Sequence, residues 1–213
     1  NICALTGADI AMVRLGIGSD PRIGGLFLFP GLGYGGSCFP KDMQALIHTA
    51  KSLGYEPRVL DAAEAVNQDQ RRLFLDRILR HYRNDLKDKV FAVWGLSFKP
   101  QTDDIREAPA LDIISGLLAA GARLQAYDPQ AMEATRQFLG DRDGLTYAGS
   151  TYEALEGADA LLIMTEWTKF REPDFERMIS MMKAPVIFDG RNIYNPAKLA
   201  KLGFEYFYIG QKA

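Results

Sequence analysis

The chain has 213 residues, of which 47% are hydrophobic and 24% are charged. These proportions are typical of a folded globular protein and exclude a disordered or collagen-like chain. The 25 basic and 27 acidic side chains give a net charge of −2, so we expect neither nucleic acid nor an anionic membrane as a partner. We expect neither a signal peptide nor a membrane span, because no basic stretch precedes an apolar one at the N-terminus and no apolar run approaches the roughly 18 residues that a span needs.

The chain has two cysteines, Cys3 and Cys38, which are too few to form a disulfide framework. Cys3 lies in a segment that is predicted to be helical, where we expect an inert core thiol. This cysteine usage favours a reducing environment, so we expect a cytoplasmic location.

Residues 1–15 are predicted to form one amphipathic helix. The apolar residues that recur at helical spacing are Leu5, Ala8, Met12 and Leu15. No helix start signal precedes them, so we expect that an N-terminal portion of the protein precedes this sequence.

A long glycine-rich segment follows, and two helices are predicted after it. Gly16–Ser37 contains eight glycines and two prolines, which indicates a loop, and long loops inside compact domains are usually functional. One helix is predicted from Pro40 to Gly54, and a second from Pro57 to about Arg83. At about 1.5 Å per residue the second helix would be roughly 40 Å long, which suits a bridge between domains or an oligomer interface.

From Lys89 onward, apolar segments alternate with helical ones, which predicts a parallel, doubly wound α/β sheet. The predicted strands are Val90–Trp94, Arg123–Tyr127, Leu145–Ala148, Ala160–Met164, Val186–Asp189 and Glu205–Tyr208. The chain is therefore expected to divide into a helical region, residues 1–88, and an α/β domain, residues 89–213.

Ligands of doubly wound sheets bind beyond the carboxyl ends of the strands, so the residues after each strand are candidate contacts. Gly95–Pro100 follows the first strand and lacks the GxGxxG pattern that holds a dinucleotide pyrophosphate at a helix N-terminus. We therefore do not expect this sheet to bind a dinucleotide in the standard way. Lys99 and Arg106, after the first strand, and Arg191, after the fifth, are candidate converging cations for phosphate. The alternative is that each is an ordinary solvated charge.

The segment Gly31–Asp42 carries the chemistry that is most specific in this sequence. Its glycines permit positive φ values and a close approach of the backbone to a ligand. Cys38 is predicted just before a helix, where free amides and the macrodipole favour a nucleophilic thiolate. Asp42 is then either a carboxylate that caps the helix or a general base that acts through water. The alternative is a buried small cysteine with an aspartate that only matches the helix dipole.

Four segments of the chain closely resemble motifs of the UDP-glucose 6-dehydrogenases, in the UDP-glucose/GDP-mannose dehydrogenase family. They are Gly16–Gly24, Gly31–Asp42, Ser97–Pro109 and Phe188–Asn192. Because these motifs are spread over the whole chain, together they are far more specific than a lone glycine-rich loop.

The resemblance implies a helical central region that dimerises, followed by a Rossmann-like UDP-binding domain. It implies oxidation of the C6 alcohol of UDP-glucose to the carboxylate of UDP-glucuronate, in two steps that each reduce one NAD. Cys38 matches the nucleophile that forms a thiohemiacetal and then a thioester. Asp42 matches the aspartate that assists the water which hydrolyses that thioester.

The resemblance also implies the residues that bind substrate and cofactor. The implied substrate contacts are Arg22, Gly33, Tyr34, Gly35, Gly36, Lys99 and Arg191. Arg22 matches an arginine that reaches the sugar site of a neighbouring subunit, which fits a homodimer formed through the helical region. Arg106 matches an arginine that reaches the NAD, and no metal ion is expected.

The chain also departs from the family, and other functions stay open. Family members begin with an NAD-binding domain that carries GxGxxG, followed by a catalytic lysine, and these 213 residues contain neither. We therefore expect the chain alone to be inactive. The alternatives are a dehydrogenase of GDP-mannose or of a UDP-N-acetylhexosamine, and a non-catalytic module that binds nucleotide sugars and dimerises. A flavodoxin-like signalling domain would fit the sheet but leaves the glycine-rich loop unexplained.

Overall fold

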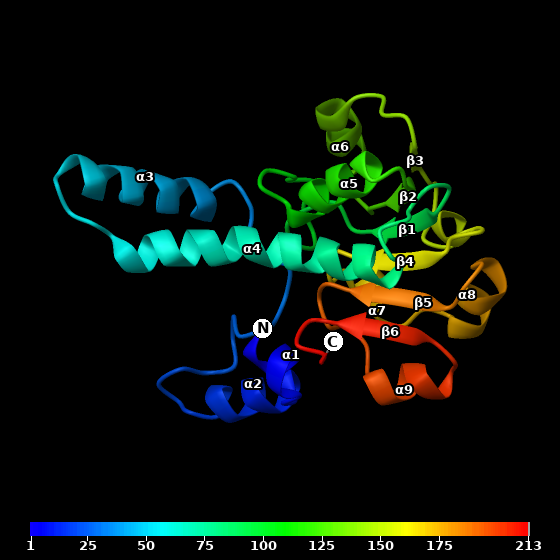
Figure 1. Ribbon diagram of the computed structural model, residues 1–213, viewed down its shortest axis with the longest axis horizontal. Coiled ribbons are helices and arrows are strands. Elements are labelled where there is room, and N and C mark those ends of the chain that lie inside the picture. The colour runs from blue at the N-terminus through cyan, green and yellow to red at the C-terminus, as the bar shows by residue number, and fades with distance from the viewer. Residues whose placement is uncertain (213) are drawn as a thin grey trace.

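A computed structural model of the protein describes residues 1–212 and contains a six-stranded sheet (Figure 1). Neighbouring strands in the sheet are parallel, in the order β3-β2-β1-β4-β5-β6. The strands are β1 Val90–Trp94, β2 Arg123–Tyr127, β3 Leu145–Tyr147, β4 Ala160–Ile163, β5 Val186–Asp189 and β6 Glu205–Tyr208. The predicted doubly wound α/β class is confirmed, although β3 and β4 each end one residue earlier than predicted.

Side chains on the two faces of the sheet enter two separate cores. On β1, Phe91 and Val93 are buried in the first core. Ala92 and Trp94 are buried in the second core, on the opposite face. A strand that is buried on both faces needs apolar side chains at successive positions. This requirement explains why β1 is recognisable in the sequence as an apolar run.

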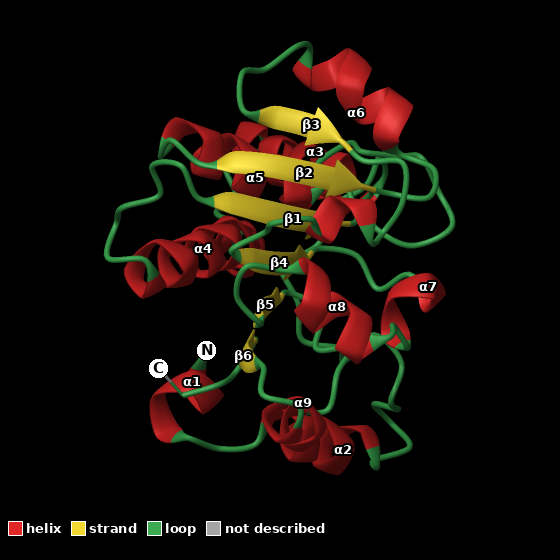
Figure 2. Ribbon diagram, turned by 90° about the vertical axis from the view of Figure 1, so that its right-hand side faces the viewer, coloured by secondary structure: helices red, strands yellow, loops and turns green. Residues whose placement is uncertain are grey.

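Helices cover both faces of the sheet (Figure 2). The first core is covered by α4 (Arg58–His81), α5 (Pro109–Ala119) and α6 (Met132–Leu139). The second core is covered by the 3₁₀-helix η1 (Glu153–Leu155), α7 (Thr168–Arg171), α8 (Phe175–Met181) and α9 (Pro196–Lys201). Within residues 1–212, no helix combines the length and the apolar character that crossing a membrane requires.

The long predicted helix is α4, whose 24 residues span about 36 Å. Its N-terminal half and α3 (Phe39–Ser52) extend away from the sheet (Figure 1). Its C-terminal half packs on the sheet, and Phe74 and Ile78 are buried in the first core. Because one helix serves both parts, the division of the chain at residue 88 stays a prediction.

The helix α4 ends two residues before the predicted Arg83. Its last residue is His81, and the two residues after Tyr82 adopt the left-handed conformation, with φ values of 53° at Arg83 and 59° at Asn84. Two consecutive positive φ values cannot continue a right-handed helix.

Residues 1–15 form parts of two helices, so the prediction of a single helix is wrong. The first, α1 (Ile2–Thr6), ends at Gly7, whose φ of 78° is left-handed. The second, α2 (Ile10–Gly18), starts from Asp9, whose carboxylate accepts hydrogen bonds from two backbone N–H groups of its first turn. Glycine favours helix C-termini and aspartate favours N-caps, so this local chemistry prevails over the apolar spacing. The glycine-rich loop consequently begins only after α2.

Candidate functional site

A groove of about 740 Å³, here called the strand-end groove, lies at the carboxyl ends of the strands. Lys99 after β1, Glu166 after β4 and Arg191 after β5 line it. The sheet order reverses between β1 and β4, which is where doubly wound sheets bind ligands. The predicted substrate contacts that line the groove are Gly33, Tyr34, Gly35, Lys99 and Arg191.

Asp128, directly after β2, ties together loops that follow three different strands. Its buried carboxylate accepts a hydrogen bond from the backbone N–H of Leu96 at 2.8 Å and from Trp167 Nε1 at 3.2 Å. It also accepts the backbone N–H of Ala131 at 2.8 Å. A buried carboxylate with several donors is well satisfied, so it fixes the loops after β1, β2 and β4 relative to one another.

Asp189, the last residue of β5, holds the turn from which Arg191 enters the groove. Its carboxylate accepts the backbone N–H groups of Arg191 and Ile193 at 2.8 Å and the hydroxyl of Tyr206 at 2.7 Å. Complete burial raises the pKa of Asp189, and these hydrogen bonds oppose that rise. The side chain of Arg191 then places Nε 2.6 Å from Glu166 Oε2.

The glycines of the loop make room for the chain's own side chains. Gly33 has a φ of 102°, and a Cβ there would collide with the side-chain oxygen of Asn67. Gly36 has a φ of 96°, and its Cβ would lie 2.8 Å from the ring of Phe98. The close approach that we expected toward a ligand is therefore also an approach toward α4 and the loop after β1.

Tyr34 connects the glycine-rich loop to two helices. Its hydroxyl donates a hydrogen bond to Glu64 Oε2 on α4 at 2.6 Å, and its ring packs edge-on against Phe39, the first residue of α3, at 4.7 Å. Burial raises the pKa of Tyr34 to about 12, with a further contribution from its bond to Glu64.

Cys38 lies at the N-cap of α3, as predicted, and its side chain is exposed. Its Sγ lies 3.7 Å from the hydroxyl of Ser37, and its carbonyl accepts the backbone N–H of Asp42 at 2.9 Å. The Asp42 carboxylate lies in the first turn and pairs with Lys41 Nζ at 2.6 Å. Cys38 follows the groove-lining loop along the chain but does not itself line the groove. Cys3 is buried, as predicted.

Arg106 lines a second pocket, of about 440 Å³. The lining of that pocket includes Gly36, Ser37, Lys41 and Arg106. The guanidinium of Arg106 donates to both carboxylate oxygens of Asp104 at 2.9 Å. This bond chiefly raises the pKa of Arg106, with a smaller contribution from Cys38. Lys99 and Arg191 thus line one groove, whereas Arg106 lines a second pocket, where it pairs with Asp104. That these three cations bind phosphate stays a prediction.

Arg22, on the loop after α2, lines neither the strand-end groove nor the second pocket. Its side chain is 87% exposed and pairs with Asp20 at 2.5 Å. Its predicted role toward a neighbouring subunit stays a prediction.

Sequence reasoning missed Asn67 and Glu166, which line the strand-end groove. Asn67 carried a signal, because it continues the stripe of Phe74 and Ile78 on α4 at helical spacing, and a polar residue on a buried stripe needs a partner. Glu166 lies in a loop, and its only signal was its place after a predicted strand.

Comparisons with protein families cover both parts of the chain. Residues 92–196 match the UDP binding domain of the UDP-glucose/GDP-mannose dehydrogenase family. Residues 1–69 match the central domain of the same family.

Individual relatives agree with this match. A UDP-glucose 6-dehydrogenase of Pseudomonas aeruginosa is 46% identical over 213 residues, which cover 99% of this chain and 47% of that protein. The structure of a UDP-glucose dehydrogenase from Pyrobaculum islandicum has a TM-score of 0.82 at 34% identity, with 99% of this chain and 45% of that chain covered. A UDP-D-ManNAc dehydrogenase from Pyrococcus horikoshii has a TM-score of 0.80 at 26% identity, with 99% and 46% covered.

The chain thus spans about half the length of the relatives that it matches. Both family domains follow one another in it, and the sheet order and the strand-end groove are those of a nucleotide-binding fold. On this evidence the chain belongs to the UDP-glucose/GDP-mannose dehydrogenase family.

Proposed function

We propose that this chain supplies the nucleotide-sugar groove and the nucleophile of an oxidoreductase that converts UDP-glucose to UDP-glucuronate. The observation that supports this most directly is the strand-end groove, where Lys99 and Arg191 face the loop Gly33–Gly35. Two cations across a groove suit a diphosphate. The same loop leads within three residues to the exposed thiol of Cys38 at a helix N-terminus.

In this proposal the chain's own chemistry is capture and hydrolysis. A first two-electron oxidation converts the C6 alcohol of the sugar to an aldehyde. Cys38 Sγ attacks this aldehyde, so that a carbon–sulfur bond forms and the aldehyde oxygen takes up a proton. Oxidation of this thiohemiacetal by two electrons yields a thioester. Water, assisted by the Asp42 carboxylate, then breaks the carbon–sulfur bond, which releases the carboxylate and restores the thiol.

NAD is the oxidant that we propose for both oxidations, but the described residues do not build a dinucleotide site. A Cβ built at Gly95 would collide with Thr165, so the turn after β1 already packs closely against that residue. The backbone N–H of Leu96 already donates a hydrogen bond to Asp128. The turn after β1 is therefore already occupied by the chain's own contacts and does not offer a site for the pyrophosphate of a dinucleotide. Arg106, at the second pocket, is the one contact that we propose toward NAD, and it is already paired with Asp104. We accordingly propose that the chain alone does not turn over UDP-glucose.

We further propose that the protein is a homodimer formed through its helical region, in the cytoplasm. Large apolar side chains on α2, α3 and the start of α4 are exposed, among them Met12, Leu46 and Val59. Most of the exposed large apolar side chains of the described residues lie in this region, which supports an interface there. The free thiols of Cys3 and Cys38 support a reducing compartment. Sedimentation at increasing protein concentration would measure the oligomeric state.

Two alternatives stay open. The structural similarity to a UDP-D-ManNAc dehydrogenase favours a UDP-N-acetylhexosamine as the second candidate substrate, and GDP-mannose follows from the family. The other alternative is a module that binds and dimerises without chemistry, in which case Cys38 would have no role.

Calorimetric titration with UDP-glucose, UDP and GDP-mannose tests the proposal. We expect UDP-glucose and UDP to bind and GDP-mannose not to bind. Preference for GDP-mannose would assign the chain to that branch, and binding of none of the three would contradict the proposed groove. Addition of NAD to the UDP-glucose complex should produce no NADH, and turnover would contradict the proposed inactivity of the chain alone.

A further inference from the structure

Three side chains on one face of α4 hold Tyr34 in the glycine-rich loop. Glu64, Asn67 and Arg71 follow one another at spacings of three and four residues, which places them on the same side of a helix. Glu64 accepts the phenol hydroxyl of Tyr34 at 2.6 Å. The other two side chains bind its backbone.

The side-chain amide of Asn67 pairs with the backbone N–H and C=O of Tyr34, as the backbone of a neighbouring β-strand would. Its Oδ1 accepts the backbone N–H of Tyr34 at 2.7 Å, and its Nδ2 donates to the backbone carbonyl of Tyr34 at 3.2 Å. Asn67 is 6% exposed, so little water competes for these bonds. Gly33 has no room for a side chain because Asn67 occupies that space.

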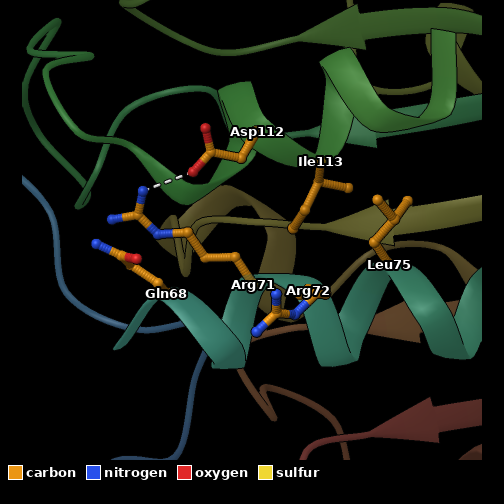
Figure 3. A pocket seen from close by; sticks show the side chains of 6 residues that line it. All are labelled: Gln68, Arg71, Arg72, Leu75, Asp112 and Ile113. Carbon is orange, nitrogen blue, oxygen red and sulfur yellow. Dashed lines mark hydrogen bonds and ion pairs between the residues drawn. The ribbon is translucent and has the colours of Figure 1, made fainter. Parts of the chain in front are cut away.

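Arg71 joins the loop to two further segments. Its Nη2 donates to the carbonyls of Tyr34 at 3.0 Å and Glu107 at 3.2 Å, and its Nη1 donates to Asp112 Oδ2 at 2.5 Å. The bond to Asp112 crosses from α4 to α5 (Figure 3). The side chain of Arg71 is only 12% exposed. The guanidinium of Arg71 therefore links the glycine-rich loop to the loop after β1 and to α5.

We propose that Asn67 and Arg71 are positioning residues that hold the glycine-rich loop in the form that binds the nucleotide sugar, and so set the position of Cys38 relative to the strand-end groove. This inference rests on the proposed function for its ligand. Neither residue needs to touch the reacting atoms.

The loop requires such external support. It lies in neither a helix nor a strand from Ser19 to Cys38, and its glycines lose more backbone entropy on ordering than other residues would. Beyond the bonds to α4, the amide of Gly36 donates to the carbonyl of Arg106 at 2.8 Å. That carbonyl belongs to the residue next to Glu107, so Arg71 steadies this second anchor as well.

The variants N67A, N67D and R71K test the proposal, with R72K as the matched control. N67A removes both bonds to Tyr34, whereas N67D keeps an acceptor for its N–H and loses the donor to its carbonyl. R71K keeps a positive charge that can pair with Asp112, but it loses the branched guanidinium whose Nη2 reaches the carbonyls of Tyr34 and Glu107. Arg72 is the next residue on the helix, is 68% exposed and pairs with Asp69.

Two measurements on each purified chain separate positioning from general stability. Hydrogen exchange compares the protection of the loop amides, Tyr34 and Gly36, with the protection of amides in β4 and β5. Calorimetry reports the dissociation constant for UDP-glucose. We expect the two loop amides to exchange roughly tenfold faster in N67A while the strand amides keep their protection. We expect UDP-glucose binding to weaken by a similar factor, with smaller effects in N67D and R71K and none in R72K.

Other outcomes would overturn the proposal. These are unchanged protection of Tyr34 and Gly36, equal loosening of the loop and the strands, or an effect of R72K as large as that of R71K. If N67A does not fold, N67D and R71K decide the matter by the same criteria. Failure of the unmodified chain to bind UDP-glucose would contradict the proposed function, and the exchange rates would still decide whether α4 holds the loop.

Discussion

Arg191 Nε lies 2.6 Å from Glu166 Oε2 at the carboxyl end of the sheet, where both side chains line the strand-end groove. Both side chains are mostly buried, at 19% and 25% exposure, so the pair is weakly screened by water. Glu166 thus neutralises and orients the cation that we assign to the diphosphate. The pair makes the groove sensitive to the loss of either partner.

Replacing Arg191 with alanine should weaken UDP binding by about 10- to 100-fold. A charge-assisted hydrogen bond to a diphosphate is lost, and Glu166 is left unpaired where its charge repels that diphosphate. Calorimetric dissociation constants for the R191A chain and the unmodified chain provide the measurement.

Two further variants make this prediction specific. R177A removes an arginine that lies over the ring of Tyr152, away from the groove, and should leave UDP binding unchanged. The double variant E166Q/R191A should bind more tightly than R191A, because the unpaired carboxylate is gone. A double variant that binds no better than R191A would show that Glu166 does not act on the ligand.

The two thiols should differ sharply in their reactivity toward an alkylating reagent. Cys38 is exposed at the start of α3, whereas Cys3 is 8% exposed. We expect one thiol equivalent to react fast in the folded chain and the second only on unfolding. The variant C38S should lose the fast phase, and C3S should keep it. A fast phase that persists in C38S would come from Cys3 and would contradict the burial of that thiol.

Acid should weaken the anchoring of the loop after β1. The Arg106 guanidinium holds the pKa of Asp104 below its usual value of 3.8, with help from the Ser37 hydroxyl. Because the pKa is lowered by folding, the stabilisation is fully present above pH 3.8 and is lost as the pH falls through the lowered folded value.

The variant D104N should therefore have a lower free energy of unfolding than the unmodified chain above about pH 5, and this difference should disappear in more acidic solution. Urea unfolding of both chains over a series of pH values measures the difference. A difference that stays constant down to pH 2 would mean that the pair with Arg106 does not lower the pKa of Asp104 in the folded chain.

Leu32 should be the main apolar anchor of the glycine-rich loop. Its side chain has no exposed area and packs against the Cα of Gly190, where a Cβ would lie 2.5 Å from Leu32 Cγ. Truncation in L32A should cost about 2–5 kcal/mol in the free energy of unfolding. The control L53A removes a side chain that is 80% exposed and should change it by less than about 0.5 kcal/mol. Equal effects of L32A and L53A in urea unfolding would contradict this role.

The sheet was predictable because its signals are local. The central strands β1, β4 and β5 are short, mostly apolar runs, and four of the six strands have the predicted bounds. The position of Cys38 before a helix was equally local, since Pro40 marks a helix start. The error at residues 1–15 shows the limit of apolar spacing. Leu5 and Met12 are 82% and 62% exposed, so among residues 1–212 their stripe faces no core that could hold one helix together across Gly7.

The α/β class, the approximate strand positions and the motifs shared with nucleotide-sugar dehydrogenases follow from the amino-acid sequence, because periodicity and motifs extend over only a few residues. Which of these residues meet depends on the packing of distant segments. Asn67 reaches Tyr34 across 33 positions of sequence, and Arg71 reaches Asp112 across 41. Lys99 and Arg191 share a groove while Arg106 turns to another, because buried Asp128 and Asp189 fix the strand-end loops and Asp104 directs Arg106. Such pairings depend on the packing of α4 and the sheet, which no local pattern encodes.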